Sequence, residues 1–85
     1  MKPPKELAIQ LFKRMYARIF RDKNFIKMSP EKMEERKAMY QEKFVEDAKS
    51  LAIIAADTIL ENKQEKKQVE DAIEHVDVSK ALSLT

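Results

Sequence analysis

The sequence predicts an all-α domain of three helices, in which one long helix is central. Two observations favour this fold class. The 85 residues include no glycine, which argues against tight β-hairpins that need positive φ angles at the turn. Apolar residues recur at helical spacing in three separate segments. Because chains of this length usually hold one core, we expect residues 1–85 to form a single domain.

The first helix is predicted over about residues 4–21. Pro3 and Pro4 suit a helix start, where the missing N–H costs no hydrogen bond. Five apolar residues that follow share one face of this helix: Ala8, Phe12, Met15, Tyr16 and Ile19. That face is expected to pack on the rest of the domain.

The central helix is predicted over about residues 30–61. Ser29 can cap its free N–H groups, Pro30 suits its first position, and no helix breaker follows before Asn62. Such a helix is about 48 Å long. Its expected core stripe consists of Met33, Tyr40, Phe44, Ala48, Leu51, Ala55 and Ile59.

A shorter third helix is predicted over about residues 65–77, after a polar turn. Its apolar face holds Val69, Ala72, Ile73 and Val76. The tail that follows contains Leu82 and Leu84 and is expected to add a helical turn at most.

The lengths of the helices predict a partner surface on the central helix. A first helix of about 27 Å, folded back antiparallel, covers the central helix only to about Ala48. The third helix covers one side of the remainder, which leaves Ile53, Ala56 and Leu60 without an obvious cover. We interpret these three residues as a site for a host protein or for a second copy of the chain, as in a homodimer. The alternative is that the tail covers them with Val78, Leu82 and Leu84.

Basic residues gather at the N-terminal end of the chain. Residues 1–28 have a net charge of +6, and residues 29–85 have a net charge of −4. The candidate residues for binding a nucleic acid or an acidic partner are Lys13, Arg14, Arg18, Arg21 and Lys23. No helix-turn-helix or aromatic stacking platform accompanies them. The alternative is a solvated face that complements the acidic central helix.

The sequence contains few residues that could support catalysis or bind a metal ion. There is no cysteine, and a glycine-rich phosphate loop is excluded. The single histidine, His75, lies four residues after Asp71, and no third ligand is evident. We therefore expect no enzyme activity, no catalytic residue, no metal and no cofactor. The absence of cysteine and of a long apolar run favours the cytoplasm and argues against a membrane partner.

The run Ala-Lys-Ser-Leu-Ala-Ile-Ile-Ala-Ala-Asp-Thr-Ile-Leu-Glu at residues 48–61 resembles a segment of small uncharacterised phage and prophage helical proteins. Those proteins carry an Ala-Leu-Ile-Ala-x-Asp-like helix after a first helix similar to residues 7–16. Thr58 departs from their pattern, in which an acidic residue follows the Asp. The resemblance implies a mobile-element origin and carries over no functional residue.

Small phage proteins often act by docking on a host or defence protein, as anti-CRISPR proteins do. By this analogy we expect a non-enzymatic accessory protein that binds a host macromolecule, for example as an inhibitor of a nucleic-acid-guided defence nuclease. Two alternatives remain open. One is a small nucleic-acid-binding protein that uses the basic face of the first helix, and the other is a self-associating structural protein.

Overall fold

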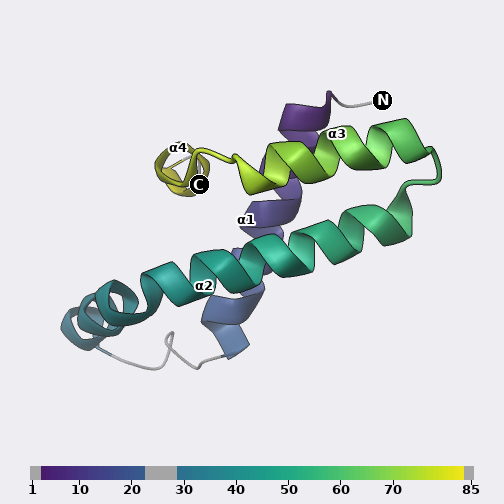
Figure 1. Ribbon diagram of the computed structural model, residues 1–85. Helices are drawn as coiled ribbons and strands as arrows, with labels where there is room; N and C mark the ends of the chain where they lie inside the picture. The colour runs from purple at the N-terminus through teal and green to yellow at the C-terminus, as the bar shows by residue number, and fades with distance from the viewer. Residues whose placement is uncertain (1–2, 23–28, 84–85) are drawn as a thin grey trace.

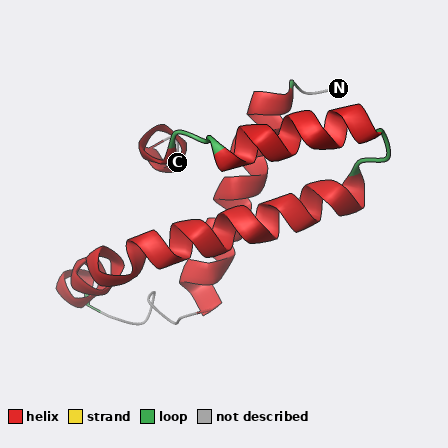
Figure 2. Ribbon diagram, viewed as in Figure 1, coloured by secondary structure: helices red, strands yellow, loops and turns green. Residues whose placement is uncertain are grey.

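The computed structural model describes residues 3–22 and 29–83, which form α1 (Pro4–Asp22), α2 (Pro30–Ile59), α3 (Lys63–Glu74) and α4 (Val78–Ser83) (Figures 1 and 2). These residues contain no strand, so the predicted all-α class is confirmed. The first two helices end within two residues of their predicted limits. The third helix was predicted two to three residues too late, because it spans Lys63–Glu74. A separate helix, α4, follows it, so the described residues form four helices and not the predicted three.

Short polar side chains set the limits of these helices. The Asn62 side-chain oxygen accepts hydrogen bonds from the backbone N–H groups of Gln64 (2.9 Å) and Glu65 (3.1 Å), so α3 begins at Lys63. The Asp77 carboxylate accepts the backbone N–H of Lys80 at 3.1 Å, and α4 begins beside it. Ser29 accepts a weaker bond of 3.4 Å and caps α2 as the sequence predicts.

The helices pack as a hairpin crossed by a third element. Figure 1 shows α2 and α3 side by side and antiparallel, with α1 passing steeply across both and α4 turned across the end of α3. The expectation that α1 lies antiparallel along α2 is therefore wrong in its orientation. A steep crossing lets one helix contact two neighbours, so α1 completes the core for both arms of the hairpin.

Two clusters of buried side chains make up the core. Cluster 1 joins the middle and end of α1 to α2 and α4 through Phe12, Tyr16, Ile19, Phe44, Ala48 and Ala81. Cluster 2 joins the start of α1 to α2 and α3 through Ala8, Leu11, Ala52, Ala56, Val69 and Ile73. The buried face predicted for the first helix is confirmed at Ala8, Phe12, Tyr16 and Ile19, while Met15 is half-buried.

Small residues line the side of α2 that meets its neighbours. Ala48, Ala52 and Ala56, which we call the alanine row, repeat every fourth residue and have 0% exposure. Rows with this spacing pack against another helix at a steep angle, and methyl side chains let the backbones approach closely. The predicted core stripe is wrong in its second half, because Leu51 and Ile59 are 39% and 57% exposed.

The N-terminal part of α2 extends beyond the core. Among the side chains described between residues 30 and 43, only Met33 is not exposed, and it packs against cluster 1. Tyr40, which the stripe placed in the core, is exposed as well. This projection helps make the molecule elongated, with extents of 44 × 21 × 19 Å. None of the described helices has both the length and the hydropathy to cross a membrane.

Candidate binding surfaces

The predicted partner surface of Ile53, Ala56 and Leu60 is largely covered in the described fold. Ala56 is fully buried, and Ile53 and Leu60 are half-buried against cluster 2. The side of α2 that carries them faces α3, as the Lys49 ammonium on the same side shows by donating to the Glu74 carbonyl at 3.1 Å. The prediction assumed that α1 stops short of this segment, whereas the start of α1 lies directly over it.

The tail does not cover these residues either. Val78 and Leu82 of α4 pack against cluster 1, at the other end of the core, and Leu84 lies outside the described residues. The helices α1 and α3 therefore bury Ala56 and cover Ile53 and Leu60 in part.

The basic face of α1 remains open to solvent. Arg14, Arg18 and Arg21 are all exposed, and the exposed residues Gln10 and Ala17 lie between and beside them on the helix. At 1.5 Å per residue the three arginines span about 10 Å along the axis. We call these three residues the arginine face. Of the other predicted binding residues, Lys13 is half-buried and Lys23 lies outside the described residues.

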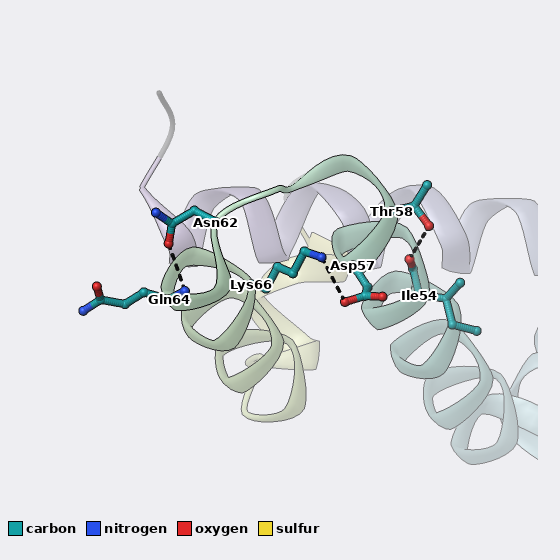
Figure 3. A network of polar contacts seen from close by, with 6 residues as sticks. All are labelled: Ile54, Asp57, Thr58, Asn62, Gln64 and Lys66. Carbon is teal, nitrogen blue, oxygen red and sulfur yellow. Dashed lines mark hydrogen bonds and ion pairs between the residues drawn. The ribbon is translucent and has the colours of Figure 1, made fainter.

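The arginine face has no partner within the described part of the chain. Arg14, Arg18 and Arg21 form no ion pair or hydrogen bond with any described residue. The described residues therefore do not support the alternative in which acids of the central helix pair with these three arginines. Asp57 of α2 contacts Lys66 of α3 at 3.5 Å (Figure 3).

A second exposed surface lies on α2, on the side away from α1 and α3. Ile54 is 62% exposed and Leu51 is 39% exposed. Thr58 adds little polarity to this side, because its hydroxyl donates to the Ile54 carbonyl at 2.9 Å (Figure 3). We call this side the open side of α2. Ile54 was not among the residues predicted for a binding surface, although its spacing of three from Leu51 places both residues on one side of the helix.

The histidine does not form an Asp–His pair of catalytic type. Its Nδ1 lies 2.9 Å from the backbone carbonyl of Asp71, and its side chain is exposed. Across the described residues, no three acids, cysteines or histidines gather closely enough to hold a metal ion. His75 also borders a groove of about 280 Å³ between α1, α3 and α4, lined by Lys5, Ile9, Ala72, Val76, Asp77 and Lys80 as well.

The core contains one polar atom that lacks a described partner. The Tyr16 hydroxyl is buried in cluster 1 and has no hydrogen-bond partner among the described residues. Burial disfavours the charged phenolate and raises the pKa of Tyr16 above its ordinary value of 10.0. An unpaired buried hydroxyl costs about 1–3 kcal/mol of folding free energy.

Replacing Tyr16 with phenylalanine is therefore expected to stabilise the protein by about 1 kcal/mol at neutral pH. Above pH 10 the wild type should lose stability as pH rises, because its unfolded state releases the phenol proton first. Tyr16→Phe removes this additional alkaline loss. Urea unfolding at pH 7 and above pH 10 measures both effects, with the exposed Tyr40→Phe as the control. A destabilised Tyr16→Phe would show that the hydroxyl has a partner.

No protein-family model, curated protein or solved structure matches this chain.

Proposed function

We propose that this protein is a non-enzymatic binding protein that docks on an acidic surface of a host protein through the arginine face of α1. The observation that carries the proposal is that Arg14, Arg18 and Arg21 are exposed, clustered and without a partner in the described chain. Charged groups that the fold does not use are available for another molecule.

Arginine suits this role chemically. Its planar guanidinium pairs with a carboxylate through two parallel hydrogen bonds and is more weakly hydrated than an ammonium group. Arginine is also enriched among the residues that contribute most to protein interfaces. Since α1 is held by both core clusters, the three guanidinium groups start from a rigid helix, which lowers the entropic cost of binding.

The nature of the partner rests on the resemblance of residues 48–61 to phage and prophage proteins. A phage-encoded docking protein would act in the host cytoplasm by occluding a functional surface, and a nucleic-acid-guided defence nuclease is one such target. This part of the proposal rests on an analogy with other small phage proteins.

A second candidate function is nucleic-acid binding by the same face. The spacing of the arginines favours it, because guanidinium groups one helical turn apart can contact successive backbone phosphates. Against it stands the composition of the face, where Gln10 and Ala17 rather than aromatic side chains accompany the arginines.

Charge reversal tests the proposal. Arg14→Glu/Arg18→Glu should abolish capture of the host protein by the immobilised chain and weaken the reconstituted complex at least about tenfold, because two like-charge contacts replace attractive ones. Lys63→Glu, an exposed reversal on α3, is the matched control and should bind normally. Equal binding by both variants would contradict the proposal.

The same variants separate the two candidates. Labelled duplex DNA and single-stranded RNA are titrated with the wild type over a series of salt concentrations. For a nucleic-acid function, the logarithm of the binding constant should fall linearly with the logarithm of the salt concentration. Binding should also be lost in Arg14→Glu/Arg18→Glu. Absence of binding at low salt excludes it and leaves the protein partner.

A further inference from the structure

We propose that two copies of this chain pair antiparallel along the open sides of their α2 helices. This side is exposed over nearly the whole helix, from Lys32 to Thr58, a length of about 39 Å. The fold gives α2 two neighbours, α1 against the alanine row and α3 beside it. The third side of the helix has no cover among the described residues.

Charges on the open side are segregated along the helix. Its N-terminal half carries the exposed bases Lys32, Arg36 and Lys43, whereas its C-terminal half carries the exposed acid Asp47. Asp57 lies at the edge next to α3, where it contacts Lys66. With a step of 100° per residue, the other acids of the N-terminal half, Glu31, Glu34, Glu35 and Glu42, fall outside this side. A helix side that is basic in one half and acidic in the other is complementary to itself when reversed.

Apolar side chains follow the same division. Met39, which is 69% exposed, and Tyr40 lie in the basic half, and Leu51 and Ile54 lie in the acidic half. An antiparallel pair therefore places apolar residues of each half against those of the other. Burial of these side chains supplies the attraction, and the charges fix the direction and register.

The register follows from two-fold symmetry. In an isologous interface, if one residue contacts a second residue on the other copy, the reverse contact also forms. An axis near residue 45 sets Lys43 against Asp47 of the second copy, twice, and sets Tyr40 against Leu51 of the second copy, because these two residues lie on the same flank of the open side. Every described side chain named in these contacts is exposed in the single chain.

The pairing accounts for the length of α2. The side chains described in residues 30–43 are exposed apart from Met33, and Tyr40 stacks on Phe44 with 5.8 Å between the ring centroids. An exposed helix of this length gains little stability by itself. In the dimer this projection lies on the C-terminal half of the other α2. The arginine face of α1 points away from α2 and stays free in both copies, so the dimer does not depend on the proposed function.

Charge exchange at Lys43 and Asp47 tests the proposal on the full chain. Sedimentation velocity from about 1 µM to 1 mM covers the dissociation constants of weak dimers. The wild type should dimerise within this range. Lys43→Asp and Asp47→Lys should each weaken the dimer at least about tenfold, because each variant creates two like-charge contacts.

Mixing the two single variants should restore dimers, since each copy then offers the charge that the other lacks, and Lys43→Asp/Asp47→Lys should dimerise as the wild type does. Ile54→Lys should also weaken the dimer, because the same axis sets residue 54 against Arg36 of the second copy, and mixing with the wild type should not restore it. Circular dichroism of every variant controls for folding, which should hold because all three positions are exposed. A wild type that stays monomeric at 1 mM, or a dimer indifferent to these variants, would overturn the proposal.

Discussion

Truncating Phe12 to alanine is expected to remove about 3–5 kcal/mol from the free energy of unfolding, which is enough to leave much of the protein unfolded at 37 °C. Phe12 has 0% exposure and lies in cluster 1, against α2 and α4 as well as its own helix. A domain of this length has a total stability of about 4–13 kcal/mol. The loss of one ring is therefore a large fraction of the whole.

Urea denaturation followed by circular dichroism measures this effect. Gln10→Ala is the matched control, because it truncates a side chain on the exposed face of the same helix and should change stability by less than about 0.5 kcal/mol. If Phe12→Ala unfolds completely, Phe12→Leu provides a milder variant with a measurable transition. A Phe12→Ala protein as stable as the Gln10→Ala control would contradict the described packing of cluster 1.

Enlarging Ala52 to leucine is expected to cost about 3 kcal/mol, the upper part of the range for overpacked cores. Ala52 stands in the middle of the alanine row, where α1, α2 and α3 approach one another, and has 0% exposure. Three added carbon atoms at this point force the helices apart. The effect runs against simple hydrophobicity, because leucine is the more apolar residue and an equally good helix former.

The matched control for Ala52→Leu is Ala38→Leu. Ala38 lies on the same helix, but in the exposed N-terminal part, so the same chemical change meets no neighbour. Thermal unfolding should show a midpoint lowered by many degrees for Ala52→Leu and nearly unchanged for Ala38→Leu. Equal midpoints would show that α1 does not cross α2 at the alanine row.

The candidate sites were only partly predictable from the sequence. The arginines of α1 were identified correctly as an exposed basic face, because their position opposite the apolar face follows from helical spacing alone. The exposed apolar residue was predicted at Ile53, whereas the more exposed isoleucine is Ile54, one residue along α2. A shift of one residue turns a side chain by 100°, and the direction of α1 decides which of the two isoleucines is covered.

The sequence by itself determined the helices. The polar turn near Asn62 ends α2, and the Asn62 side chain caps the start of α3. The absence of glycine argues against folds that need tight hairpins. These interactions lie within a few residues of each other, so they can be recognised without knowing the fold.

Tertiary structure alone decided which residues of α2 are buried. Leu51 and Ile59 are more hydrophobic than Ala52 and Ala56, yet the alanines form the core and the larger residues face solvent. The physical reason is that a steep helix crossing requires short side chains at the contact, and burial depends on the neighbour as much as on the residue. The long helix was therefore predictable as an element, with Phe44 and Ala48 among its buried residues, whereas the buried side of its C-terminal half was not.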